Sequence, residues 1–128
     1  MSGIAITLGD PAGIGPEVTE KAIKQLTSHP GIILFGHAHH VASFKPFTGI
    51  IKENTIYGYP IKTSKQPSLT PDDPSNAIIA YESIQSALAC CNEYSIKRLV
   101  TAPISKAGLL AANIPYTGHT SMLKDHFN

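Results

Sequence analysis

A short, mainly apolar segment that stops at a glycine-rich loop is the feature of this sequence that most limits its possible folds. Residues 4–8 (IAITL) lead directly into GDPAGIG at residues 9–15. Three glycines in seven positions allow positive φ angles and a close approach of the backbone to a ligand. Pro16 suits the first turn of a helix, and Glu17 suits the positive end of the helix dipole. The segment therefore predicts a buried strand, a tight loop and a helix start.

This strand–loop–helix arrangement presents free backbone N–H groups, which can bind an anion such as a phosphate. The spacing is neither G-x-G-x-x-G nor a P-loop, because no Lys-Ser or Lys-Thr pair follows the glycines. A tight connection between strand and helix, with no ligand, is the alternative interpretation.

The composition is typical of one compact globular domain and gives no electrostatic support for nucleic-acid binding. The chain has 128 residues, of which 42% are hydrophobic and 15% charged, and its formal net charge is +1. A nearly neutral chain lacks the basic surface of proteins that bind nucleic acid or anionic membranes. No apolar run approaches the ~20 residues of a membrane-spanning helix, and no signal peptide is visible. We therefore expect a cytoplasmic protein with a single domain over residues 1–128.

The cysteines and clustered histidines do not favour a redox or metal site. Cys90 and Cys91 are adjacent in a helical pattern, where neighbours point about 100° apart and are poorly placed to bridge each other. We expect both thiols to be reduced and at least one to be buried. His37, His39 and His40 could suggest a metal, but imidazoles two residues apart lie on different faces of a helix. A solvated helix start is the favoured interpretation, with metal binding as the alternative.

Short apolar runs alternate with helical patterns along the chain, which predicts an α/β fold with a largely parallel sheet and flanking helices. In the first helix, the apolar residues Val18, Ala22 and Leu26 recur at helical spacing. Residues 49–65 look like short extended pieces or a hairpin, and Ser75 is the expected N-cap of a long helix. The expected strands include residues 4–8, 32–35 and 98–101, and the expected helices begin near residues 16, 38, 75, 106 and 120.

Two loops carry side chains that could bind an anionic ligand outside the carboxyl ends of the strands. Ser105 is a candidate N-cap and places Lys106 at a helix N-terminus, where a cation is unfavourable by a few tenths of a kcal/mol. This placement favours an anionic partner for Lys106, although a solvated surface lysine is equally compatible with it. His119 and Thr120 stand at another helix start and could bind a phosphate, carboxylate or hydroxyl. A histidine that ties two loops together is the alternative there.

Three motifs, in order along the chain, resemble the 4-hydroxythreonine-4-phosphate dehydrogenase family of vitamin B6 biosynthesis. They are TLGDPAGIGPE at residues 7–17, VTAPISK at residues 100–106 and YTGHT at residues 116–120. The resemblance spans residues 4 to about 125 and is weakest between residues 38 and 71. It implies a fold like that of isopropylmalate dehydrogenase, with two α/β lobes, a cleft between them, and a homodimer.

The resemblance also implies a reaction and its cofactors. Such an enzyme oxidises the secondary alcohol of 4-phosphohydroxy-L-threonine with NAD or NADP, and the resulting β-keto acid loses carbon dioxide to give an amino-ketone phosphate. A divalent metal (zinc, magnesium or cobalt), held by histidines of which the partner subunit donates one, acts as a Lewis acid on the hydroxyl. The implied partner is a phosphorylated small molecule, with no nucleic acid and no membrane.

The resemblance carries over to particular positions. His119 and Thr120 match the family's substrate-binding His-Thr pair, whereas no catalytic residue is assigned. Ser121 departs from the acidic residue that often follows this pair, and the metal-binding histidines of the family lie downstream of it, outside these 128 residues. Four further residues match family sequence and are expected to line the cleft: Asp10, Gly13, Gly15 and Lys106.

The chain therefore corresponds to the N-terminal part of the two-lobe fold, as a fragment or a truncated form, and we do not expect it to turn over substrate alone. Two alternatives fit the same motifs. One is a dehydrogenase of a related four-carbon sugar-acid phosphate, such as threonate or erythronate phosphate. The other is a non-catalytic binding or interaction remnant.

Overall fold

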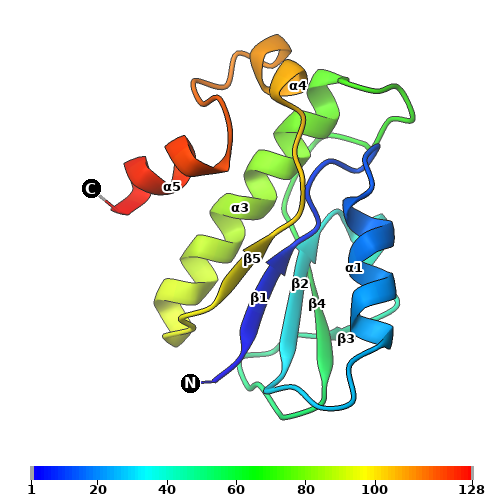
Figure 1. Ribbon diagram of the computed structural model, residues 1–128, viewed down its shortest axis with the longest axis vertical. Coiled ribbons are helices and arrows are strands. Elements are labelled where there is room, and N and C mark those ends of the chain that lie inside the picture. Colours follow the sequence, from blue (N-terminus) through cyan, green and yellow to red (C-terminus); the bar gives the residue numbers. More distant parts are fainter. Residues whose placement is uncertain (1, 128) are drawn as a thin grey trace.

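A computed structural model describes residues 2–127 and places helices on both faces of a five-stranded sheet (Figure 1). The sheet order is β3-β4-β2-β1-β5, and every neighbouring pair is parallel, so the predicted α/β class is confirmed. No helix within residues 2–127 is long and apolar enough to cross a membrane. The strands are β1 (Ile4–Thr7), β2 (Ile32–Gly36), β3 (Lys45–Pro46), β4 (Ile56–Pro60) and β5 (Leu99–Thr101). The helices are α1 (Gly15–Lys24), α2 (Ala38–Val41), α3 (Pro74–Tyr94), α4 (Lys106–Ala111) and α5 (His119–Phe127).

The core lies on both faces of the two central strands, β1 and β2. On one face, Ala5 and Phe35 pack with Ala87 of α3. On the other face, Leu34 packs with Ile23 of α1. Every residue of β2 is buried, as expected of a parallel strand covered by helices on both sides.

α1 buries a different face from the one that its apolar residues predict. The apolar spacing indicates a buried face of Val18, Ala22 and Leu26, yet all three are exposed. A Cβ on Gly15 would lie 2.1 Å from the carbonyl oxygen of Leu8, so α1 approaches the end of β1 too closely for any larger residue. Side-chain size as well as polarity therefore decides which residues of α1 can face the sheet. The residues that do so are Gly15, Thr19 and Ile23.

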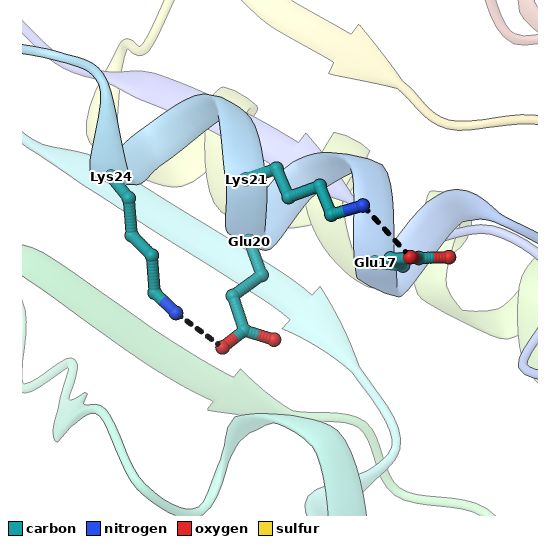
Figure 2. A network of polar contacts seen from close by, with 4 residues as sticks. All are labelled: Glu17, Glu20, Lys21 and Lys24. Atoms are coloured by element: carbon teal, nitrogen blue, oxygen red, sulfur yellow. Dashed lines mark ion pairs between the residues drawn. The ribbon is translucent and has the colours of Figure 1, made fainter.

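Two ion pairs lie on the solvent side of α1 (Figure 2). Glu17 and Lys21 approach to 3.0 Å, and Glu20 and Lys24 approach to 3.1 Å, each pair one helical turn apart. All four side chains are mostly exposed, so each pair stabilises the helix by only about 0.3 kcal/mol. Close packing against the sheet, rather than surface charge, therefore holds α1 in place.

Residues 49–65, predicted as short extended pieces or a hairpin, contain β4. This strand runs parallel to both of its neighbours, β2 and β3. Because a hairpin joins antiparallel strands, the hairpin alternative is wrong and the extended interpretation is confirmed. An extended segment looks the same in sequence whichever direction its partner runs, which is why the pattern left both open.

α3 begins at Pro74, and its N-cap is Asp73 rather than the expected Ser75. The Asp73 carboxylate accepts a hydrogen bond of 2.8 Å from the backbone N–H of Ser75. Pro74 occupies the first turn, where its missing N–H leaves no bond unmade. The helix then runs across β1 and β2 and ends at Ser95, which adopts the left-handed conformation (φ 55°).

Candidate functional site

The candidate site lies at the carboxyl ends of β1 and β5, where the loops that follow these two strands meet. The backbone N–H of Asp10 donates to the carbonyl oxygen of Pro103 at 3.1 Å. Gly9 has a positive φ of 74°, and a Cβ there would lie 2.3 Å from the same Pro103 oxygen. The loop after β1 therefore packs directly on the loop after β5. Parallel strands bring residues far apart in sequence to one edge of the sheet in this way.

A first pocket, of about 370 Å³, brings together the cation and the His-Thr pair that the motifs singled out. Ser105 caps α4 by accepting a hydrogen bond of 2.9 Å from the N–H of Gly108, as predicted, and this places Lys106 at the first position of the helix. The Lys106 Cε lies 3.8 Å from the position that a Cβ on Gly118 would occupy. The pocket is lined by Pro103, Ile104, Lys106, Thr117, Gly118, His119, Thr120 and Ser121.

His119 is the half-buried member of this first pocket. Burial lowers its pKa below the ordinary value of 6.5, and a contact with the backbone of Ala102 opposes that shift. The imidazole is therefore neutral at pH 7, with one nitrogen that donates and one that accepts. Its Nε2 atom is buried without a hydrogen-bond partner among residues 2–127. A buried polar atom left in this state is unusual in proteins, and a ligand group in the pocket would satisfy it.

The two hydroxyl residues after His119 have different environments. Thr120 is exposed and lines the pocket. Ser121 instead donates to the carbonyl oxygen of Gly118 at 3.1 Å and accepts from the N–H of Thr117 at 3.2 Å. Ser121 thus holds the turn that leads into α5.

A second pocket, of about 320 Å³, lies beside the glycine loop and shares Pro103 and Ile104 with the first. It contains two carboxylates, Asp10 and Asp72. Asp10 is only 6% exposed, and its Oδ1 accepts a hydrogen bond of 2.8 Å from the N–H of Ala12. Ser105 donates to Asp72, which joins this pocket to the start of α4. Two carboxylates disfavour a phosphate here and favour hydroxyl or ammonium groups.

The six residues expected at the site thus fall into three groups. Lys106, His119 and Thr120 share the first pocket. Asp10 and Gly13 line the second. Gly15 is buried against Leu8 and Ala102 and lines neither pocket, so the fold itself accounts for a glycine there.

Sequence reasoning missed Asp72. It lies in the loop before α3, and its contact with Ser105 joins positions 33 residues apart. Its positive φ of 61° is a local feature that Asp tolerates better than most residues, but no pattern in the loop signals the contact.

The histidine cluster lines a separate pocket together with Pro11 of the glycine loop, and the two cysteines lie on α3 outside both site pockets. His37 caps the short helix α2 by accepting a hydrogen bond of 3.1 Å from the N–H of His39. Among residues 2–127, no three side chains of His, Cys, Asp or Glu come close enough together to hold a metal ion. Both cysteines are free and Cys90 is buried, as expected. Burial raises the pKa of the Cys90 thiol to about 11 and also raises that of Cys91.

The chain is similar to known proteins of one family. The family model described as "Pyridoxal phosphate biosynthetic protein PdxA" matches residues 16–128. The chain belongs to the PdxA family. The resemblance drawn from the three motifs is therefore confirmed.

Individual PdxA relatives are similar over nearly the whole chain. A protein of Halalkalibacterium halodurans, assigned as a D-threonate 4-phosphate dehydrogenase, is 32% identical over 95% of this chain. A 4-hydroxythreonine-4-phosphate dehydrogenase of Cupriavidus pinatubonensis is 30% identical, also over 95%. The crystal structure of 4-hydroxythreonine-4-phosphate dehydrogenase from Klebsiella pneumoniae matches 95% of this chain with a TM-score of 0.78 and 26% identity. The chain spans only 42%, 40% and 42% of these three proteins, respectively.

Proposed function

We propose that this chain forms the phosphate-binding part of a nicotinamide-dependent dehydrogenase that acts on a phosphorylated four-carbon hydroxy acid. The observation that carries the proposal is the pocket in which Lys106, His119 and Thr120 converge. An ammonium group, an imidazole and a hydroxyl are suitable donors for a phosphate or carboxylate. Membership of the PdxA family, whose relatives include 4-hydroxythreonine-4-phosphate dehydrogenases, supports the reaction class.

The leading substrate is 4-phosphohydroxy-L-threonine, oxidised at its secondary alcohol and then decarboxylated to an amino-ketone phosphate in pyridoxal phosphate biosynthesis. NAD or NADP supplies the hydride acceptor when bound. Lys106 offsets the charge of the substrate phosphate, and the buried Nε2 of His119 makes one hydrogen bond to the substrate. Thr120 adds a second hydrogen bond. These three residues bind and orient the substrate, and none is assigned a proton-transfer step.

The second pocket has a complementary role in this proposal. Because Asp10 and Asp72 disfavour phosphate, the pocket would receive a hydroxyl- or ammonium-bearing part of the bound molecules. The shared wall of Pro103 and Ile104 would then separate the anionic end of a ligand from its hydroxylated or cationic end.

A second candidate substrate is D-threonate 4-phosphate. The relative from Halalkalibacterium halodurans, which is 32% identical to this chain, carries that assignment. Both substrates have a phosphate and a secondary alcohol, so the first pocket accommodates either. A non-catalytic binding remnant is the third candidate, and an assay of NAD or NADP reduction, with and without the rest of the PdxA fold, separates it from the other two.

The other features that we propose for this protein rest on the family resemblance. They are a divalent metal (zinc, magnesium or cobalt), a homodimer, a cytoplasmic location, and residues 1–128 acting as one α/β unit of the two-lobe fold. The described residues offer no cluster of three metal ligands, so a metal in the whole protein would require ligands from outside residues 2–127.

Ligand titration of the isotope-labelled chain, followed by NMR, tests the binding step. We expect 4-phosphohydroxy-L-threonine and D-threonate 4-phosphate to shift the amide signals of Lys106, His119 and Thr120, whereas unphosphorylated 4-hydroxythreonine leaves them unchanged. Replacement of the cation in Lys106→Met should weaken binding about tenfold, the loss of one charge-assisted hydrogen bond.

Lys62→Met is the matched control, because Lys62 is an exposed lysine outside both pockets. It should bind the phosphorylated ligands as the parent chain does. Equal affinity for the phosphorylated and unphosphorylated compounds, or equal losses in the two lysine variants, would contradict the proposal.

A further inference from the structure

The helix that carries His119, α5, buries only one of its residues. Met122 is 2% exposed and belongs to an apolar cluster with Leu88 of α3 and Leu109 of α4. Residues 124–127, which form the rest of the helix beyond Leu123, are all exposed. A single buried side chain fixes the position of a helix poorly, because the helix can still tilt about that contact. Further contacts are therefore needed to hold α5 in one place.

Tyr116, in the loop before α5, makes two such contacts. Its hydroxyl donates a hydrogen bond to Oδ2 of Asp125, in the last turn of α5. Its ring stacks on Tyr81 of α3, with ring centroids 6.1 Å apart and an interplanar angle of 26°. The hydrogen bond to the carboxylate raises the pKa of the Tyr116 hydroxyl above its ordinary value of 10.0, so this group remains a donor at neutral pH. One side chain thus links α5 to α3.

Asp125 stands at a position that is unfavourable for an acidic residue. The last turn of a helix carries the negative end of the helix dipole, where a carboxylate is destabilising. The ion pairs found within residues 2–127 lie on α1 and do not involve Asp125. The hydrogen bond from Tyr116 is therefore the interaction that offsets the unfavourable placement of this carboxylate.

The position of α5 also determines where His119 lies. His119 and Met122 are three residues apart and share one face of the helix. A tilt of α5 about Met122 would move the imidazole away from the backbone of Ala102 and expose its buried Nε2 atom. The contacts that hold α5 are therefore contacts that keep His119 in the first pocket.

We propose that Tyr116 is a positioning residue, which holds α5 against α3 through Asp125 and Tyr81 and thereby keeps His119 in the first pocket. Neither Tyr116 nor Asp125 lines this pocket, so Tyr116 acts on a ligand through His119. The proposal rests on the proposed function where it concerns substrate binding. The placement of His119 itself can be measured without any ligand.

An NMR titration of the His119 imidazole with pH tests the placement. In the parent chain, burial holds the pKa of His119 below 6.5. Lys106, the other charged side chain that lines the first pocket, is the same in every variant. Tyr116→Phe keeps the ring on Tyr81 and removes only the hydroxyl. We expect the pKa of His119 to rise toward 6.5 in this variant, because a less firmly held α5 exposes the imidazole to water.

Two variants of Asp125 separate the hydrogen bond from the effect of charge. Asp125→Ala removes the acceptor and should raise the pKa of His119 as Tyr116→Phe does. Asp125→Asn also removes the charge but keeps an oxygen that can accept from the Tyr116 hydroxyl, so it should behave like the parent chain. Both substitutions relieve the unfavourable placement in the helix dipole, so a difference between them reports on the acceptor. Tyr94→Phe, the same change at the other end of α3 from the site, is the matched control and should have no effect.

The affinity for 4-phosphohydroxy-L-threonine, followed by NMR, is the second measurement. Tyr116→Phe and Asp125→Ala should each weaken binding about fivefold, the loss expected for one hydrogen bond. The variant with both changes should weaken binding no further than either single change, because the two groups act through one contact. Asp125→Asn and Tyr94→Phe should bind the ligand as the parent chain does.

The titration decides the proposal. An unchanged pKa of His119 in both Tyr116→Phe and Asp125→Ala would overturn it, whatever the two changes do to unfolding. Equal effects of Asp125→Ala and Asp125→Asn on His119 would also overturn it, because the hydrogen bond would then not be responsible. A raised pKa of His119 together with unchanged affinity would support the positioning role and contradict the proposed function instead. Absence of ligand binding by the parent chain would likewise count against the proposed function, while the titration still tests the role of Tyr116.

Discussion

Substitution of the glycines in the loop after β1 tests whether the fold, rather than a ligand, requires them. Gly9 has φ 74°, and an added Cβ would lie 2.3 Å from the carbonyl oxygen of Pro103 and 3.0 Å from that of Ala102. Gly13 has no positive φ, and an added Cβ would lie 3.3 Å from its nearest neighbour, the carbonyl oxygen of Asp10. Gly9→Ala and Gly13→Ala therefore add the same atom to the same loop in different environments.

The expected destabilisation by Gly9→Ala follows from two costs. The left-handed conformation costs about 1 kcal/mol for alanine relative to glycine. Displacement of the Pro103 carbonyl, which also accepts the Asp10 N–H, adds about 1–3 kcal/mol of overpacking. We expect a total of about 3 kcal/mol for Gly9→Ala. Gly13→Ala should change stability by less than about 1 kcal/mol, because slight movement of an exposed loop relieves the contact.

Urea unfolding followed by circular dichroism measures both changes. With a slope near 1.5 kcal/mol/M, the unfolding midpoint of Gly9→Ala should fall by about 2 M relative to the parent chain. The midpoint of Gly13→Ala should move by less than about 0.7 M on the same basis. Equal shifts for the two variants would refute the reasoning, because the packing of the two loops would then not explain the glycine at position 9.

Three further predictions concern the core, the histidine and the thiols. Leu109 is fully buried, whereas Leu110 is 79% exposed. In urea unfolding, Leu109→Ala should therefore lower the free energy of unfolding by about 3 kcal/mol, and Leu110→Ala by less than about 0.5 kcal/mol. Similar losses for the two variants would contradict the assignment of Leu109 to the buried face of α4. The pKa of His119 is lowered by burial, so the unfolded state binds its proton more readily and stability should fall as the pH drops below about 6.5. His119→Asn should flatten that part of the plot of Tm against pH, and an unchanged slope would count against the burial. Iodoacetamide should modify Cys91 before Cys90, whose pKa is about 11 and which is 3% exposed; equal rates in a mass-spectrometric time course would contradict this.

The order of the elements could be predicted from the sequence because it depends on local chemistry. The cap at Ser105 is an example: a hydroxyl residue after Pro103 and before a helical pattern needs only its own neighbours to form the bond. The parallel sheet followed from the alternation of apolar runs with helices. The N-cap of α3 was predicted at Ser75, two residues after the actual cap at Asp73. Serine and aspartate are both common N-cap residues, so the sequence alone did not distinguish between them.

The buried face of α1 could not be predicted, because polarity does not report how closely a helix approaches a sheet. Gly15 and Thr19 face inward since they are small, and Val18 faces outward although it is apolar. The distance between α1 and the sheet depends on the contact of Gly15 with Leu8 and Ala102, which the apolar spacing of the helix does not contain.

Only some of the residues that line the two pockets could be predicted from the sequence, and their arrangement could not. The motifs singled out Lys106, His119 and Thr120, and the fold places them around one pocket. Their role in binding substrate stays a prediction. Asp72 reaches the site through a contact across 33 residues, and no periodicity or spacing rule encodes such a contact. The first pocket contains a cation and the second contains two carboxylates, and this difference depends on how the loops after β1 and β5 pack together.

The open edge of β5 also has a consequence for synthesis. In a full-length relative, the corresponding strand leaves the ribosome when more than half of the chain has still to be made. At roughly 5–20 residues per second, this edge waits for on the order of ten seconds, close to identical edges on neighbouring ribosomes of the same message. Its brevity, three residues preceded by the like charges of Lys97 and Arg98, opposes pairing between nascent chains during that interval. The shortness of β5 thus limits pairing between nascent chains during synthesis.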